Sequence, residues 1–94
     1  MRRIEPKNVF KRDLKREMKG RYRLIVAGEM WEVVNTLAND ISLDFIYSDH
    51  PLKGKWRGSR ECHIAPDLLL VYRFEGDDIL WLERLGSHSE IFDM

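Results

Sequence analysis

Apolar residues in the first half of the chain recur at helical spacing. Phe10, Leu14 and Met18 lie four residues apart with Lys and Arg between them, which predicts a basic amphipathic helix that ends near Gly20. A second stripe, with steps of three or four residues, predicts another helix over residues 22–38 and consists of Leu24, Ala27, Trp31, Val34 and Ala38. Two helices with so short a link are expected to pack as a hairpin.

The last third of the chain shows the patterns of strands. Residues 56–64 alternate, so that Glu61 and His63 face one side of the expected strand and Cys62 faces the other. Residues 68–74 are almost continuously apolar, which predicts a central strand that is covered on both faces.

Shorter segments complete the predicted fold. A strand is expected at residues 79–85, and the S-x-x-E pattern of residues 87–90 predicts a capping box that opens a short C-terminal helical turn. Residues 2–5 form a first strand, ended by Pro6. The order β-α-α-β-β-β plus the C-terminal turn indicates the α+β class, with a helix hairpin packed on one face of a small, mainly antiparallel sheet. The length fits a single domain over residues 1–94.

The formal net charge of zero conceals a strong asymmetry. Residues 1–23 hold ten basic and three acidic side chains, a net charge of +7, whereas residues 24–94 hold six basic and thirteen acidic ones, a net charge of −7. Such a division predicts a basic face for an anionic partner, although the solvated side of an amphipathic helix has the same pattern.

Other features of the composition narrow the class of protein. No apolar run approaches the ~20 residues of a membrane span, and the charged N-terminal segment lacks the apolar core of a secretory signal. The single cysteine excludes an internal disulfide. We therefore expect a cytoplasmic protein without a membrane partner.

Side chains suited to proton transfer gather in the strand region. All three histidines, His50, His63 and His88, fall in loops or strand positions of one meander, together with Glu61 and Asp67. A meander can bring such positions to one edge of the open sheet face, where imidazoles and carboxylates are the usual groups of acid–base catalysis. Each residue also has a structural interpretation, since Asp67 follows a proline in a turn and Glu61 has arginine neighbours.

Basic side chains crowd the same region, at Lys53, Lys55, Arg57 and Arg60. Cations beside acid–base groups suit a phosphodiester substrate, because negative charge develops on the phosphoryl oxygens during its cleavage. RNA supplies its own nucleophile, the 2′-hydroxyl, so the protein needs only a base, an acid and cations. Phe92 can stack on an unpaired base.

A zinc site is the rival interpretation of these residues. The three histidines, Asp67 and Cys62 are zinc ligands by type. However, the chain has no H-x-x-x-H or C-x-x-C pair, and the adjacent Cys62 and His63 point to opposite faces of a strand. We therefore expect neither a metal nor another cofactor.

Several separated motifs resemble one family of bacterial toxins. The segments DHPLKGKWRG (residues 49–58), RECHIAPD (60–67), LLVY (69–72) and ERLGSHSEIF (83–92) resemble the YafQ branch of the RelE superfamily. The likeness is close over residues 45–92 and generic before them. It implies the RelE α+β fold and an endoribonuclease that cuts mRNA in the ribosomal A site. The implied mechanism needs no metal and proceeds by 2′-hydroxyl attack, which leaves a cyclic phosphate.

The resemblance also implies roles for individual residues. The catalytic positions of the branch correspond to His50, His63, Asp67 and His88. A substrate contact is implied for Phe92, which would position the RNA, and Glu61, which is also expected to contact the substrate, falls at a position that is acidic in relatives. The crowded cations Lys53, Arg57 and Arg60 are expected to contact the substrate because of their charge. Contacts of the basic helix with 16S ribosomal RNA would use Lys11, Arg12, Lys15, Arg16 and Lys19. A cognate antitoxin would neutralise the protein, and the choice of general base and general acid stays open.

Two other functions are compatible with the same fold. Relatives of the ParE type inhibit gyrase without this set of histidines, so the chain could be a non-catalytic toxin. It could also be a plain RNA-binding or antitoxin-binding module that works through its basic helix. The fold alone does not decide between these functions, and the histidine set favours the nuclease.

Overall fold

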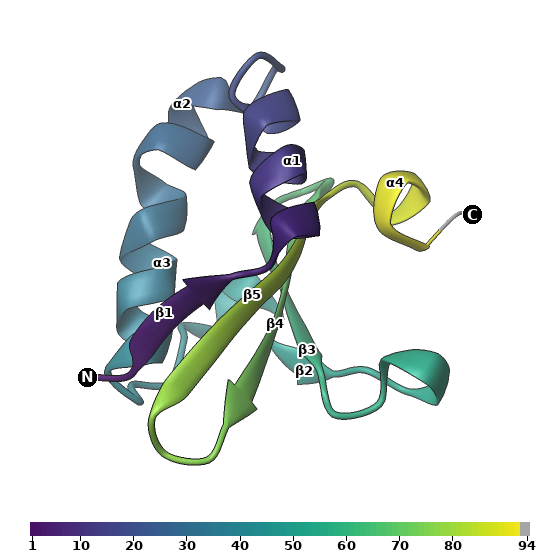
Figure 1. The fold of residues 1–94 in the computed structure, drawn as a ribbon. Coiled ribbons are helices and arrows are strands. Elements are labelled where there is room, and N and C mark those ends of the chain that lie inside the picture. The colour runs from purple at the N-terminus through teal and green to yellow at the C-terminus, as the bar shows by residue number, and fades with distance from the viewer. Residues whose placement is uncertain (93–94) are drawn as a thin grey trace.

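Five strands form one mixed sheet in the structure, a computed structural model that describes residues 1–92 (Figure 1). The strands are β1 (Arg3–Pro6), β2 (His50–Pro51), β3 (Arg60–Ala65), β4 (Leu68–Glu75) and β5 (Ile79–Gly86). Their order across the sheet is β1-β5-β4-β3-β2. Strand β1 runs parallel to β5, and all other neighbours are antiparallel, which confirms the expected mainly antiparallel sheet.

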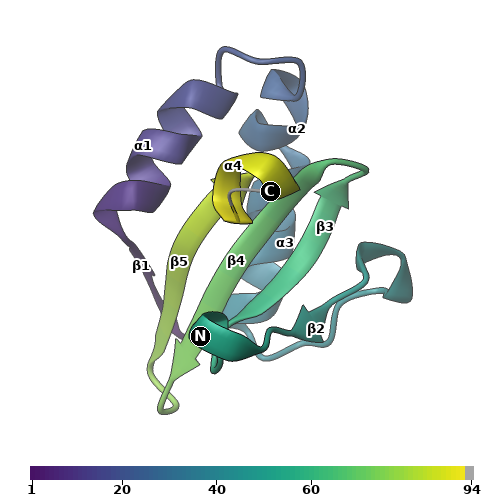
Figure 2. The ribbon, with the colours of Figure 1, turned by 90° about the vertical axis from the view of Figure 1, so that its right-hand side faces the viewer.

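Helices cover both faces of this sheet. On one face lie α1 (Asn8–Glu17), α2 (Arg23–Ala27) and α3 (Glu29–Ala38), and on the other lies α4 (His88–Phe92). In Figure 2, α4 is in front of the sheet and α3 behind it. Two single turns of 3-10 helix, η1 (Phe45–Tyr47) and η2 (Gly54–Trp56), flank β2 in the chain. No helix in the described part of the chain has the length and apolar composition that crossing a membrane requires.

The strand β4 lies between two apolar cores. On the side of the long helices, its residues Leu70 and Tyr72 are fully buried together with Phe10 of α1. On the other side, its residue Leu69 packs with Ile91 of α4. The prediction of a central strand covered on both faces is therefore confirmed.

The second predicted helix is divided at Gly28. This residue has φ −124° and ψ −87°, outside the helical region, so the helix stops after Ala27 and begins again beyond the break. The predicted apolar stripe was wrong at its start, because Leu24 is 79% exposed and Ala27 is exposed, whereas Val26 is buried. A helical period cannot be continued through such a break, since the break changes which side chains face the core.

The strand expected from residue 56 begins only at Arg60. Trp56 belongs to η2 instead, and its side chain packs in the smaller core. Gly58, between the two, has φ +98°, which residues with a side chain rarely adopt. Upstream, His50 lies in the extended strand β2, as the proline that follows it favours, and it pairs directly with Glu61.

Candidate active site

Three imidazoles surround one buried carboxylate. The Nε2 atoms of His50, His63 and His88 lie 2.9, 3.8 and 3.9 Å from Oε2 of Glu61. Glu61 is only 4% exposed, whereas the side chains of the three histidines are 45%, 30% and 44% exposed. The carboxylate therefore forms the floor of this cluster, and the imidazoles form a rim that a ligand can reach.

Strand register explains why these four residues meet. His50 lies directly opposite Glu61 in the β2–β3 pair. His63 is two positions further along β3 and therefore on the same face, as the sequence period predicted. Leu69 of β4 pairs with His63 on one side and with the last residue of β5 on the other, two residues before His88.

The two neighbours of His50 constrain where its protons lie. Its Nδ1 is 2.6 Å from the carbonyl oxygen of Ser48, which can only accept, so Nδ1 carries a hydrogen. Its Nε2 then faces Oε2 of Glu61, and the 2.9 Å contact is favourable only if a proton lies between these two atoms. The geometry of the His50–Glu61 pair is therefore suited to passing a proton to a ligand.

The second carboxylate oxygen of Glu61 has no partner among residues 1–92. This atom, Oε1, is buried and accepts no hydrogen bond from a described residue, and the indole Nε1 of Trp56 is in the same state. Leaving a buried polar atom unpaired costs roughly 1–3 kcal/mol. Such an acceptor and such a donor fit a site whose hydrogen bonds are completed by a ligand or by water.

A row of rings extends the cluster towards the C-terminus. The ring centroids are 6.2 Å apart for His50 and His63, 5.9 Å apart for His63 and His88, and 5.9 Å apart for His88 and Phe92. Trp56 meets Phe92 edge-on at 5.5 Å. The residue predicted to stack on a base therefore lies at the end of the histidine row.

Asp67 stands apart from the histidines. It lies in the turn between β3 and β4, and its side chain is 47% exposed. Its ion-pair partner is Arg21, at 3.9 Å. Within the described residues, no ion pair joins Asp67 to a histidine, and its catalytic role stays a prediction.

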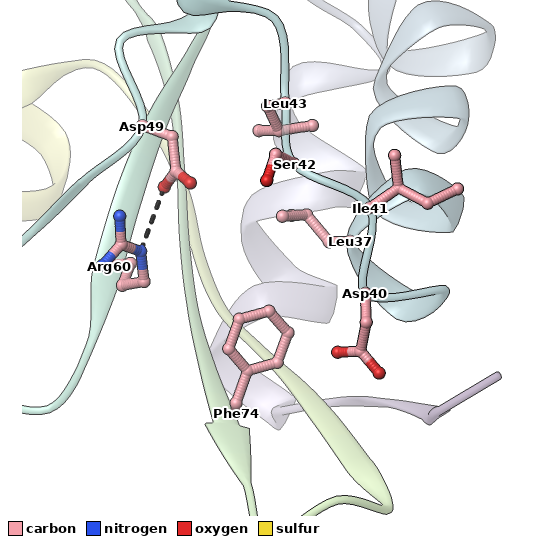
Figure 3. A pocket seen from close by; sticks show the side chains of 8 residues that line it. All are labelled: Leu37, Asp40, Ile41, Ser42, Leu43, Asp49, Arg60 and Phe74. Atoms are coloured by element: carbon pink, nitrogen blue, oxygen red, sulfur yellow. Dashed lines mark hydrogen bonds and ion pairs between the residues drawn. The ribbon is translucent and has the colours of Figure 1, made fainter.

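Arg60 points to the opposite side of β3 from the histidines. Its Nε lies 3.3 Å from Oδ1 of Asp49, which also accepts a hydrogen bond from the hydroxyl of Tyr72. Burial and this bond to Asp49 raise the pKa of Tyr72 well above its usual range. Figure 3 shows Arg60 and Asp49 on the wall of a pocket of about 300 Å³, with Ile41 and Phe74 on other parts of its lining. The predicted contact of Arg60 with substrate is therefore not on the histidine face.

The remaining predicted cations divide into free and paired side chains. Those that are exposed to solvent and form no ion pair within residues 1–92 are Lys11, Arg12, Lys15, Lys19, Lys53 and Arg57. Arg16 differs from them because its guanidinium forms ion pairs with Asp13, Glu17 and Glu90. Arg16 is thus already bound within the chain.

Sequence reasoning missed two features of this region. Glu61 was expected to contact substrate, but its place at the centre of the three histidines was not predicted. The signal was its position in mid-strand, beside His63 on the same face. Asp13 carried no signal, because its buried contacts with Arg84 join residues that are 71 positions apart.

The architecture is that of a class of small bacterial toxins, two of which have similar solved structures. A copper-bound mutant toxin from Helicobacter pylori matches with a TM-score of 0.85 at 41% identity, over 98% of this chain and 100% of that one. YafQ from Escherichia coli strain BL21(DE3) matches with a TM-score of 0.84 at 32% identity, over 98% of this chain and 99% of that one. The predicted α+β fold is confirmed by these structures.

Within that class, the chain belongs to the YafQ family. The family described as "Bacterial toxin of type II toxin-antitoxin system, YafQ" matches residues 2–93. The mRNA interferase toxin YafQ of Escherichia coli K12 is 43% identical over 54 residues, which are 57% of this chain and only 58% of that protein. The putative toxin YafQ of Haemophilus influenzae is 34% identical over 84 residues, 86% of this chain and 82% of that one. The resemblance inferred from the motifs is confirmed, and it extends into the N-terminal half.

Proposed function

We propose that this chain is the toxin of a type II toxin-antitoxin system and cleaves mRNA on the ribosome as an endoribonuclease. The observation that carries the proposal is the cluster of three imidazoles around Glu61, whose second oxygen is buried and has no partner within residues 1–92. The substrate class is supported by the Escherichia coli relative, which is named an mRNA interferase. Action on translating ribosomes would take place in the cytoplasm.

The cluster holds the groups that 2′-hydroxyl attack requires. The imidazole of His63, beside Glu61 and open to solvent, accepts the 2′-hydroxyl proton as the 2′-oxygen bonds to phosphorus. The His50–Glu61 pair gives its proton to the 5′-oxygen as the bond from phosphorus to that oxygen breaks. The products are a 2′,3′-cyclic phosphate and a 5′-hydroxyl, and the reaction consumes no metal or cofactor.

The other predicted residues surround this reaction. His88 holds the phosphoryl oxygens or shares in proton transfer, and Asp67 orients the substrate or an imidazole. Phe92 stacks on a base at the end of the ring row. The exposed Lys53 and Arg57 neutralise phosphates next to the scissile bond.

The exposed cations of the N-terminal segment are suited to ribosomal RNA. All five predicted side chains, Lys11, Arg12, Lys15, Arg16 and Lys19, are exposed to solvent, and of these Arg16 forms ion pairs within residues 1–92. A concentrated positive patch binds nucleic acid through its phosphates and releases counterions, so the affinity falls as salt rises. This patch is proposed to dock the protein on 16S ribosomal RNA.

A different surface fits the antitoxin. Phe45 and Ile46 of η1 are 89% and 65% exposed, and Ile41 is 60% exposed. Residues 24–52 contain five acidic side chains and no Lys or Arg, so this surface repels phosphates. It suits a protein segment with apolar and basic side chains. YafQ of Escherichia coli, 32% identical to this chain, has been solved in a complex with the antitoxin DinJ.

The test is a cell-free translation reaction with a defined mRNA and purified protein. New RNA ends are mapped by primer extension. Parallel reactions omit ribosomes, contain EDTA with magnesium restored, or use the variant His50→Ala/His63→Ala/His88→Ala. Codon-phased cuts that need both ribosomes and the histidines, and that survive EDTA, are expected.

Each other outcome contradicts part of the proposal. Cuts without ribosomes would indicate a free ribonuclease. Cuts that EDTA abolishes would indicate a metal-dependent enzyme. Growth arrest in cells without any cuts, and unchanged in the triple variant, would indicate a non-catalytic toxin with gyrase as the next target.

A further inference from the structure

A buried carboxylate joins α1 to the junction between β5 and α4. Asp13 is 2% exposed. Its Oδ2 accepts hydrogen bonds from Nε of Arg84 at 2.7 Å and from the backbone N–H of Leu85 at 3.0 Å. Its Oδ1 accepts from Nη1 of Arg16 at 3.1 Å and from Nη2 of Arg84 at 3.3 Å. The carboxylate therefore binds Arg84 and Leu85, the two residues that precede Gly86 at the end of β5.

Arg16 extends this connection to α4 itself. Its Nη2 donates to the carbonyl oxygen of Leu85 at 2.8 Å, and its Nε lies 3.1 Å from Oε2 of Glu90. Glu90 in turn closes the capping box of α4, where its Oε1 accepts from the N–H of Ser87 at 2.9 Å and its N–H donates to Oγ of Ser87 at 3.1 Å. The side chains of α1 thus contact both the end of β5 and the first turn of α4.

Gly86 allows this close approach. A Cβ at this position would lie 2.6 Å from Nη2 of Arg16, closer than real contacts allow, and 3.0 Å from Oε1 of Glu90, which is a tight contact. A residue with a side chain would push Arg16 away from the junction. Gly86 is therefore needed for the guanidinium to reach the backbone of β5.

Within the described residues, α4 has further contacts through Phe92, which packs against Trp56, and through the carbonyl oxygen of Glu90, which accepts from Nη2 of Arg84 at 3.4 Å. The helix consists of five residues, and a helix of this length is not stable alone. Ile91 anchors it in the smaller core, beside Leu69. The same short helix carries His88 and Phe92, so its position decides the distance from His88 to the carboxylate of the active site.

We propose that Asp13 is a positioning residue for the active site. Together with Arg84 and Arg16 it holds the start of α4 so that His88 stays beside Glu61. The proposal depends on the proposed function only for the identity of the reaction, mRNA cleavage, in which His88 takes part. The displacement of His88 can be measured without any assay of cleavage.

The variants are Asp13→Asn and Arg16→Gln, with Glu17→Gln as the control. Asp13→Asn retains the size of the side chain but removes the charge that pairs with Arg84. Arg16→Gln is the second variant. The side chain of Arg16 is 41% exposed, whereas that of Asp13 is 3% exposed, so replacing Arg16 should destabilise the fold less. Glu17 contacts the same guanidinium at 2.9 Å, but its only ion pair within residues 1–92 is this one with Arg16.

The first measurement is the NMR spectrum of the histidine rings in each folded variant. We expect the ring signals of His88 to shift or broaden in Asp13→Asn and Arg16→Gln, while those of His50 stay in place. Glu17→Gln should leave both rings unchanged. Unmoved His88 signals in both folded variants would overturn the proposal.

The second measurement is single-turnover cleavage of mRNA on programmed ribosomes. A small misplacement of a reacting group lowers the rate by about 10- to 100-fold, and we expect this loss at saturating ribosome concentration for Asp13→Asn. The half-saturating ribosome concentration should change little, because the exposed cations of α1 remain. If the cleavage rate of Asp13→Asn falls only in proportion to the fraction of unfolded protein, then Asp13 has a structural role and does not position His88. If the wild type cleaves nothing while His88 still moves in the spectra, the proposed function fails and the positioning role stands.

Discussion

His50 and Glu61 lie opposite each other across β2 and β3, with Nε2 of His50 2.9 Å from Oε2 of Glu61. The strand β2 has only two residues, and its pairing with β3 is what brings this imidazole to the carboxylate. The contact leaves Oε1 of Glu61 buried and unpartnered within residues 1–92. One buried carboxylate therefore organises all three histidines.

The first prediction concerns this carboxylate. Glu61→Gln retains the shape of the side chain but removes the negative charge that attracts the three imidazoles. We expect cleavage to fall by at least ~100-fold, the scale of general acid–base catalysis, while the circular dichroism spectrum stays unchanged. Single-turnover cleavage on programmed ribosomes measures the loss.

Glu75→Gln is the matched control for that prediction. Glu75 is an exposed residue of β4 whose carboxylate accepts a hydrogen bond from the indole of Trp81, away from the histidines. It should cleave at the wild-type rate. If Glu61→Gln also cleaves at that rate, Glu61 takes no part in proton transfer.

The second prediction concerns Phe92 as a stacking residue. Base–aromatic stacking is worth about 1–3 kcal/mol per base, which corresponds to a factor of about 5 to 150. We expect Phe92→Ala to lower kcat/KM for mRNA cleavage by a factor in this range, and Phe92→Tyr to retain most of the activity. An equal loss in both variants would show that Phe92 acts through its packing on Trp56 instead.

Local sequence patterns predicted the parts of the site that depend on neighbouring residues. The two-residue period predicted that Glu61 and His63 lie on one face of a strand. In the structure, Nε2 of His63 lies 3.8 Å from Oε2 of Glu61 on that face. The S-x-x-E pattern predicted the capping box, which is formed by two hydrogen bonds between Ser87 and Glu90. These features needed only the geometry of a single strand or turn.

Parts of the site that depend on distant residues could not be predicted. The register that sets His50 opposite Glu61 involves a strand too short to have a pattern of its own. The burial of Asp13 depends on Arg84, and nothing in the sequence of an amphipathic helix indicates that one acidic residue on it will meet a distant arginine. The sequence contains Gly28 within the second predicted helix, but it does not indicate that this glycine breaks the helix and changes which side chains face the core.

The third prediction concerns the acid side of the stability profile. The hydrogen bond from the backbone N–H of Ser87 lowers the pKa of Glu90 below its ordinary value of 4.5, with further help from Arg16. A carboxyl group whose pKa is lower in the folded state stabilises the protein above its unfolded pKa, and this contribution is lost as the pH falls. We expect Glu90→Gln to lower the free energy of unfolding at pH 6 to 7, with the difference shrinking as the pH falls below 4.5 and vanishing only below the lowered pKa of the folded state. Urea unfolding at several pH values, followed by tryptophan fluorescence, measures this difference. A difference that is constant with pH would show that the charge of Glu90 does not hold α4.

The last prediction concerns the exposed apolar surface of η1. Phe45→Ser/Ile46→Ser removes two side chains that are 89% and 65% exposed, so folding should be unaffected. We expect the Kd for the purified cognate antitoxin to rise by at least ~10-fold, because truncating a hot-spot side chain at the centre of an interface costs about 2 kcal/mol or more. Cleavage without antitoxin should stay at the wild-type rate, since neither residue belongs to the histidine cluster.

Leu24→Ser is the control for this surface, because Leu24 is also an apolar residue that is 79% exposed but lies on α2. It should leave the Kd unchanged if the antitoxin docks on η1. Charge reversal at Lys11 and Lys15 should mainly weaken binding to ribosomes, and should do so less at high salt. If charge reversal instead abolishes antitoxin binding while the η1 variant retains it, then the antitoxin and the ribosome compete for the same basic face of α1.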